Sequence, residues 1–235
     1  KGTATPVRFF PDYSSKNSFI VRALVFGIIL IIVELVLHFI RSYAIFNSGL
    51  FGDTKLEFEF GFLDTESWSH YLVMALTNLL IIAIVEEFVF RGFFQNQFEK
   101  VLPKWQSLAM ASILFGLMHL PIAILVYEME GLLLVYSLIE WIGMGMIFGY
   151  AYQISRNIWV CIFWHGLHNV LIGTFNWRMV EYEKVPSEMV QFSVGSLGLI
   201  VYFMTTMLLL YISRNKFTDD TAWNDKVTTQ AIEWD

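Results

Sequence analysis

Six apolar runs, each close to the length that crosses a lipid bilayer, restrict the fold of this chain more than any other feature. A membrane-spanning helix needs about 20 apolar residues, and open sheets leave backbone groups unpaired in lipid. Only 15% of the 235 residues are charged and 56% are hydrophobic, whereas a soluble domain carries roughly 25% charged residues. We therefore expect an all-α, polytopic membrane bundle of about six transmembrane helices that encloses a polar cavity. The predicted spans are Phe19–Ile40, Tyr71–Phe94, Trp105–Val126, Leu132–Gln153, Ile158–Phe175 and Val194–Ser213.

Polar segments at both ends of the chain set the expected domain boundaries. We expect an N-terminal tail at residues 1–18, a transmembrane domain at 19–213 and a polar C-terminal tail at 214–235. The first apolar run is longer than the core of a signal peptide, which predicts a retained membrane helix.

Lysines and arginines predict the orientation, because short cytoplasmic loops carry an excess of them. After six crossings, both termini share one side of the membrane with most of the basic residues. An integral, multi-pass protein with both termini in the cytoplasm is therefore expected. The basic residues on that side are Lys1, Arg8, Lys16, Arg22, Lys100, Lys104, Arg156, Arg214, Lys216 and Lys226.

Several kinds of site are excluded by composition. No basic run is present, so the chain is not expected to bind nucleic acid. Cys161 is the single cysteine, which excludes an intrachain disulfide and a multi-cysteine metal site. Between the first two spans, Lys55–Phe62 alternates polar and apolar residues. That pattern is typical of a short surface strand, or of a segment lying along the lipid headgroups.

Two adjacent acidic residues, Glu86 and Glu87, lie inside the second apolar run. An ionisable group at bilayer depth is costly and indicates a functional site by default. Glu87 and Arg91 are four residues apart on one helix face, so they are expected to pair. Adjacent helix residues diverge by about 100°, which leaves Glu86 available as a general acid or base. A structural Glu–Arg clamp between helices is the alternative, although it leaves Glu86 unexplained.

The third and fifth runs each contain polar residues at helical spacing. Phe115 and His119 are four residues apart, and Pro121 loosens the helix just beyond the histidine. Taken alone, His119 is more typical of a hydrogen-bonded packing residue. His165 and Asn169 share a face and can direct two donors to one point, as an oxyanion hole requires, or can tie helices together. The neighbouring His168 faces the same region or the interior beside it.

Taken together, these groups point to hydrolysis. A glutamate, a histidine and a His/Asn pair from three helices can converge in the core of a bundle. They supply a base, an imidazole that orients water and donors for an oxyanion, which together can hydrolyse an amide or an ester. The remaining intramembrane polar residues, Glu34 with His38 and Glu140, are expected to bridge helices or to line a polar cavity.

Three motifs on these spans, in this order, resemble the CPBP family of CAAX-protease and bacteriocin-processing (Abi) intramembrane proteases. The resemblance covers a motif core at about 71–175, and it implies a conical cavity open to the cytoplasm and to lipid. The motifs are Glu-Glu-x-x-x-Arg (Glu86, Glu87, Arg91), Phe-x-x-x-His (Phe115, His119) and His-x-x-x-Asn (His165, Asn169).

The resemblance also implies roles for the site residues. Glu86, with His119, would activate a water molecule, and His165 and Asn169 would form the oxyanion hole. The supporting residues would be Glu87, Arg91, Phe115 and His168. We expect no cofactor and favour a glutamate-dependent protease, with zinc held by Glu86, His119 and His165 as the alternative, because three ligands leave zinc an open position.

The expected function is an intramembrane endopeptidase that cuts a peptide or a membrane-anchored protein near the cytoplasmic face. Its partners would be that substrate, the lipid bilayer and, in addition, a membrane protein. The alternative is a non-catalytic scaffold or bacteriocin-immunity protein that binds a partner through the same cavity. A proton-coupled carrier is a third interpretation, but the sequence shows no repeated halves.

Overall fold

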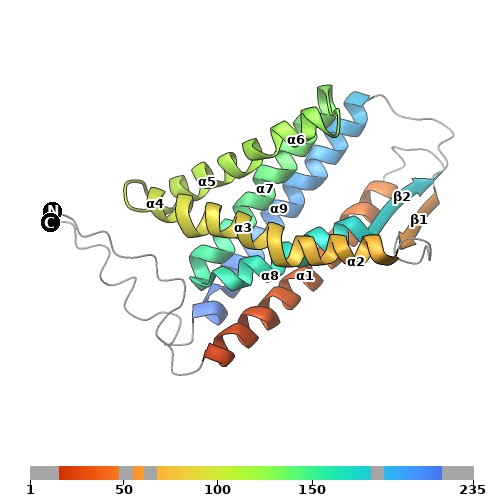
Figure 1. Ribbon diagram of the computed structural model, residues 1–235. Helices are drawn as coiled ribbons and strands as arrows, with labels where there is room; N and C mark the ends of the chain where they lie inside the picture. The colour runs from red at the N-terminus through yellow and green to blue at the C-terminus, as the bar shows by residue number, and fades with distance from the viewer. Residues whose placement is uncertain (1–15, 48–54, 61–67, 181–187, 219–235) are drawn as a thin grey trace.

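The computed structural model describes residues 16–47, 55–60, 68–180 and 188–218 of the chain. In these residues the backbone is folded mainly into helices, which form six rods (Figure 1). The second rod is one continuous helical run with changing hydrogen-bond pattern, and the third has a break near its end. The rods are α1 (Lys16–Asn47), α2 to α4 (Trp68–Phe98), α5 with α6 (Lys104–Met118, Leu120–Leu125), α7 (Gly131–Ser155), α8 (Ile158–Thr174) and α9 (Glu188–Thr218).

The rods run alternately back and forth between the same two ends of the bundle (Figure 1). Contacts between turns define one of these ends. Arg156, after α7, forms an ion pair of 2.7 Å with Glu99, after α4. Gln153 donates to the backbone carbonyl of Lys104, where α5 begins. The start of α1 and the end of α9 lie at this same end (Figure 1).

Five helical runs in the described residues are long and apolar enough to cross a membrane, which confirms the predicted polytopic α-helical class. The fifth predicted span, Ile158–Phe175, is shorter than expected. Its helix α8 has 17 residues and ends at Thr174, and Phe175 begins a strand. Seventeen residues are about 26 Å of helix, at the lower limit for a span. The five runs are Ala23–Arg41, Trp68–Phe98, Lys104–Leu125, Gly131–Ser155 and Phe192–Ile212.

A two-stranded sheet lies at the opposite end of the bundle from the start of α1 and the end of α9 (Figure 1). Strand β1 (Lys55–Phe60) pairs antiparallel with β2 (Phe175–Val180), with Lys55 opposite Val180. Of the two interpretations of the alternating segment, the strand is confirmed for residues 55–60. The strand β2 was not predicted.

The second rod changes its helical hydrogen bonding around the acidic pair. The π-helical segments η3 (Asn78–Ile82) and η4 (Phe88–Gln95) flank the short α-helix α3 (Ala83–Glu87). Turns of π-helix occur frequently at functional sites. Here they place Glu86 and Glu87 in the one α-helical turn between two wider segments.

The third rod breaks at His119, as the position of Pro121 predicted. Helix α5 ends at Met118 and α6 begins at Leu120, with Pro121 in its first turn. Proline has no N–H and clashes with the preceding turn, so the regular backbone hydrogen bonds of the helix cannot continue unchanged through this point. His119 is therefore at the helix end, where its backbone direction differs from that of a mid-helix residue.

Polar side chains of the second rod bind carbonyl groups of α7. Arg91 donates to the carbonyl of Gly145 at 2.9 Å, and Gln95 donates to that of Gly149 at 3.0 Å. The two glycines are four residues apart and allow close packing, because a Cβ at Gly145 would lie 3.0 Å from the Ser112 backbone. Small residues at such spacing let membrane helices approach closely. The two hydrogen bonds therefore hold the second rod and α7 in a defined register, and the glycines bring α7 close to α5.

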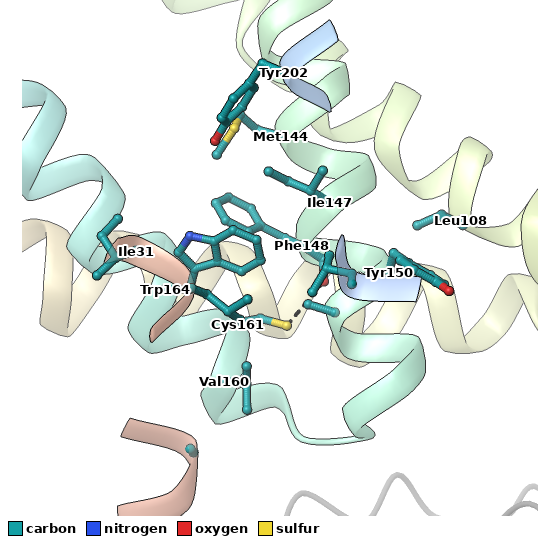
Figure 2. Close-up of a cluster of buried hydrophobic side chains, with 14 residues drawn as sticks. Ile31, Leu108, Met144, Ile147, Phe148, Tyr150, Val160, Cys161, Trp164 and Tyr202 are labelled. Atoms are coloured by element: carbon teal, nitrogen blue, oxygen red, sulfur yellow. Dashed lines mark hydrogen bonds between the residues drawn. The ribbon is translucent and has the colours of Figure 1, made fainter. Parts of the chain in front are cut away.

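The core of the bundle lies between α1, α7, α8 and α9, with Leu108 added from α5 (Figure 2). Trp164 is fully buried and meets Phe148 edge-to-face, with ring centroids 5.1 Å apart. The thiol of Cys161 donates to the carbonyl of Phe148 at 3.3 Å. Cys161 is thus a buried packing residue in the core, and α8 is fixed closely against α7.

Candidate functional site

The predicted pair of Glu87 and Arg91 is present and deeply buried. Their Oε1 and Nη1 atoms are 2.9 Å apart, and the side chains are 0% and 1% exposed. The Arg91 guanidinium also lies over the rings of Phe115 and Phe148, at 4.7 Å and 5.6 Å from the ring centroids. With the bond to the Gly145 carbonyl, these contacts compensate a charge that is otherwise very costly in the interior.

His165 of α8 joins this pair. Its Nδ1 is 2.7 Å from the same Glu87 oxygen that binds Arg91. The ring stacks on Phe148, with centroids 4.8 Å apart and an interplanar angle of 23°. The imidazole is therefore fixed in position by its hydrogen bond to Glu87 and by stacking on Phe148.

Glu86 faces His165 from the other side. Its Oε2 lies 3.7 Å from Nε2 of His165, and its side chain is 17% exposed. This separation is longer than a hydrogen bond, and two polar atoms at such a distance can share a bridging water. Among the described residues, the Glu86 Oε2 atom has no hydrogen-bond partner. A carboxylate oxygen and an imidazole nitrogen are thus both available to one small polar molecule.

The hydrogen bonds determine which nitrogen of each histidine carries a proton. His119 Nδ1 lies 2.8 Å from the Phe115 carbonyl, which can only accept, so Nδ1 is protonated and neutral His119 has its lone pair on Nε2. Glu87, which is paired with Arg91, likewise accepts from Nδ1 of His165. Nε2 of His165 can therefore donate to an oxyanion only when the ring is an imidazolium.

His119 belongs to the same region but not to the closest cluster. Its ring stacks on Trp141 of α7, with centroids 4.9 Å apart and an angle of 18°. Phe115 contacts both histidine rings, at 4.9 Å from His119 and 5.8 Å from His165. Phe115 therefore joins the third motif to the second, as a ring that packs between two imidazoles.

The remaining two residues of α8 take different positions. Asn169, one turn beyond His165, is half-buried on the same helix. His168 is buried and binds Glu34 of α1 through its Nδ1. Glu34, which was expected to bridge helices or to line a polar cavity, bridges α1 and α8 through Trp164 and His168. The side chain of His38 lies outside the described residues.

A metal does not fit the arrangement as it stands. Within the described residues, no three His, Cys, Asp or Glu side chains lie close enough together to hold one ion. Glu86 Oε2 and His165 Nε2 face each other at 3.7 Å, whereas the ring of His119 stacks on Trp141 of α7. The alternative ligand set of Glu86, His119 and His165 is therefore not assembled here.

Sequence reasoning missed two rings that orient the histidines. Phe148 stacks on His165 and Trp141 stacks on His119. Both belong to α7, which carries none of the three motifs. The available signal was the small-residue pattern Gly145-x-x-x-Gly149, which indicates a close helix interface beside these rings.

Residues 68–171 match the family model described as Rce1-like, type II CAAX prenyl endopeptidase Rce1-like. This segment runs from α2 into α8 and includes all three motifs. The resemblance that the motifs indicated is thereby confirmed. No curated protein and no solved structure matches the chain.

Proposed function

Residues 68–171 belong to the Rce1-like family of type II CAAX prenyl endopeptidases, and from this premise we propose that the chain is a glutamate-dependent endopeptidase acting on prenylated CAAX sequences. The family supports a CAAX-type intramembrane protease in general. The finer proposal concerns the substrate bond and the roles of the residues. A CAAX sequence is a cysteine, two aliphatic residues and a terminal residue, and the cysteine carries the prenyl group. The bond to be cut follows that cysteine.

One observation carries the proposed chemistry. Glu86 Oε2 is buried, has no hydrogen-bond partner among the described residues and faces Nε2 of His165 at 3.7 Å. Glu87 also has one oxygen, Oε2, without a partner among the described residues, but its Oε1 binds both Arg91 and His165. Of the two adjacent carboxylates, Glu86 is therefore the one free to take a proton. A general base must be within reach of the proton that it removes.

In the proposed reaction, Glu86 removes a proton from a water molecule whose oxygen attacks the scissile carbonyl carbon. His119 accepts the water's other hydrogen in a hydrogen bond through Nε2, which the Phe115 carbonyl leaves as the acceptor. The carbonyl oxygen becomes an oxyanion, stabilised by Asn169 and by protonated His165. Glu87 supports that imidazolium through Nδ1. The intermediate then breaks its C–N bond, and Glu86 returns the proton to the leaving amine.

The membrane position of the site fits a lipid-anchored substrate. Glu86 and His119 lie on helical runs with many exposed apolar side chains, Trp68–Phe98 and Lys104–Leu125, and His165 lies on the more buried helix α8. A prenyl chain partitions into the same apolar medium, at about 0.8 kcal/mol per buried CH₂. The anchor would thus bring the adjacent peptide bond to the depth of the carboxylate.

The test uses the purified full chain in liposomes with a farnesylated peptide that ends in a CAAX sequence. Mass spectrometry should detect release of the C-terminal tripeptide. The matched control is the same peptide without the farnesyl group, which should be cleaved far more slowly because its anchor is missing. Absence of tripeptide release from the farnesylated peptide would contradict the proposal, and would favour the scaffold alternative, in which the cavity only holds a partner.

A further inference from the structure

A second buried carboxylate binds α8, on the face beside the one that Glu87 binds. Glu34 of α1 is 2% exposed. It accepts a hydrogen bond of 2.6 Å from Nε1 of Trp164 through Oε2, and its Oε1 binds Nδ1 of His168. The two partners are four residues apart and therefore share one face of α8. One side chain of α1 thus holds two consecutive turns of α8.

The face held by Glu34 lies directly beside the face that carries the proposed oxyanion hole. Trp164 and His168 are each followed by a site residue, His165 and Asn169 respectively. Successive helix residues are rotated by about 100°, so the two i, i+4 pairs form adjacent faces of the same two turns. Any rotation or axial shift of α8 that moves one pair moves the other by the same amount.

Packing alone restricts the rotation of α8 about its axis less than these hydrogen bonds do. Gly27 of α1 allows a close approach, because a Cβ there would lie 3.0 Å from Cβ of Phe163. Such contacts limit the distance between two helices, but in lipid all helix faces are apolar and rotation is weakly specified. Hydrogen bonds to one buried carboxylate fix the rotation, since their donors must point at it. Figure 2 shows Trp164 between Ile31 of α1 and Phe148 of α7.

Other polar groups complete the surroundings of Glu34. Glu140 of α7 interacts electrostatically with Arg41 of α1 and with His168. Tyr202 of α9 lies close enough to Glu34 to interact with it. The cluster therefore joins α1, α7, α8 and α9, and it contains both acidic and basic members. This balance allows a carboxylate to remain inside the bundle.

We propose that Glu34 is a positioning residue for the peptidase reaction: through Trp164 and His168 it sets the rotation and depth of α8, so that His165 and Asn169 face Glu86. The inference rests on the proposed function, in which those two residues stabilise the oxyanion. Glu34 does not touch the reacting atoms. Its effect is on turnover, because the oxyanion forms only as the bond is attacked.

Two substitutions separate positioning from general stability. Glu34→Leu removes both bonds to α8, whereas Trp164→Phe removes only the indole N–H and keeps a large aromatic ring. In the farnesylated-peptide assay, both should lower kcat and leave KM unchanged. For Glu34→Leu the loss should be on the order of 100-fold, as for misplacement of a catalytic group by about 1 Å. Glu34→Gln keeps one acceptor and should lose less than Glu34→Leu.

The matched control is Tyr152→Phe, which removes an interhelical hydrogen bond between Tyr152 and Asn96 away from α8 and should keep the wild-type kcat. Hydrogen–deuterium exchange gives a readout that does not depend on activity. Amides at residues 164–169 should exchange faster in Trp164→Phe and Glu34→Leu, and not in Tyr152→Phe. If Glu34→Leu does not fold, the kcat and the hydrogen exchange of Trp164→Phe test whether Glu34 positions α8.

Unchanged exchange in α8, or a wild-type kcat in Trp164→Phe, would overturn the role of Glu34 while leaving the peptidase proposal intact. Failure of the wild-type chain to cleave the peptide would instead count against the peptidase proposal. The exchange experiment would then still decide whether Glu34 fixes α8.

Discussion

At the scale of single residues, the two adjacent glutamates differ in the partners that they have among the described residues. Glu87 binds Arg91 and His165 with a single oxygen, Oε1, and is fully buried. Glu86 is partly exposed, and its Oε2 lies 3.7 Å from Nε2 of His165, which is longer than a hydrogen bond. Glu87 is thus a structural residue and Glu86 a candidate catalytic one. The rotation of about 100° between neighbouring helix residues directs the two side chains to different surroundings.

Glu87→Gln should destabilise the fold. The change leaves the Arg91 guanidinium buried without its counter-charge, which costs about 3–5 kcal/mol in comparable buried pairs. Denaturation in detergent micelles measures the free energy of unfolding. Glu99→Gln is the matched control, because it breaks the partly exposed pair with Arg156, and such pairs contribute about 0–1 kcal/mol. Equal losses in the two variants would contradict the assignment of Glu87.

Trp141→Leu should lower turnover by about tenfold. The stack on His119 contributes about 0.5–1.5 kcal/mol, and about 1.4 kcal/mol corresponds to a factor of ten in rate. Steady-state kinetics on the farnesylated peptide should show the loss in kcat, and Trp141→Phe should restore most of it. Trp105→Leu removes an exposed tryptophan and serves as the control. If Trp141→Leu matched this control, the stack would have no role in placing His119.

At the scale of elements, α7 is the helix that orders the site although it carries no motif. Its carbonyl groups bind Arg91 and Gln95, and its rings stack on both site histidines. Gly145 and Gly149 also bring α7 close to α5, where a Cβ would meet Ser112 and Leu108 respectively. A change at this interface is therefore expected to affect stability and activity together.

Gly145→Ala should destabilise the bundle by about 1–3 kcal/mol, the usual cost of overpacking. Its Cβ would lie 3.0–3.2 Å from backbone atoms of Ser112. A backbone segment, unlike a flexible side chain, cannot change rotamer to relieve this contact. The matched control is Gly92→Ala, whose Cβ would meet only the flexible end of Ile158 at 3.3 Å. Thermal unfolding of both variants checks the difference. Equal melting temperatures would show that α5 and α7 can separate without cost.

The features that could be predicted from the sequence are those determined by residues close together in the chain. The break at His119 follows from Pro121, and the pairing of Glu87 with Arg91 follows from their spacing on one helix. The partner of Glu34 was not predictable in this way. Its contacts depend on how α1 and α8 are rotated about their own axes, and in lipid an apolar sequence carries little information about rotation. The pairing of β1 with β2 is likewise between distant segments.

At the scale of the whole molecule, alternation of the rods brings the beginning of α1 and the end of α9 to one end of the bundle (Figure 1). The turns that contain Lys100 and Arg156 lie at this end too. Because short cytoplasmic loops carry an excess of Lys and Arg, this end is the expected cytoplasmic side.

Topology mapping should therefore find both termini in the cytoplasm. Cytoplasm-specific reporters fused to either end should be active, and a tag inserted within residues 181–187 should be accessible only from the opposite side. Termini on opposite sides would mean that one of the six rods does not cross the membrane. The first candidate would be α8, which is the shortest rod, with 17 residues.

The central claim is that Glu86 activates the water that cleaves the substrate. Glu86→Gln tests it most directly, because the amide keeps the size of the side chain and removes the base. We predict that kcat on the farnesylated peptide falls by at least about 100-fold, while peptide binding and the melting temperature stay at their wild-type values. Cleavage at the wild-type rate by folded Glu86→Gln protein would contradict the account.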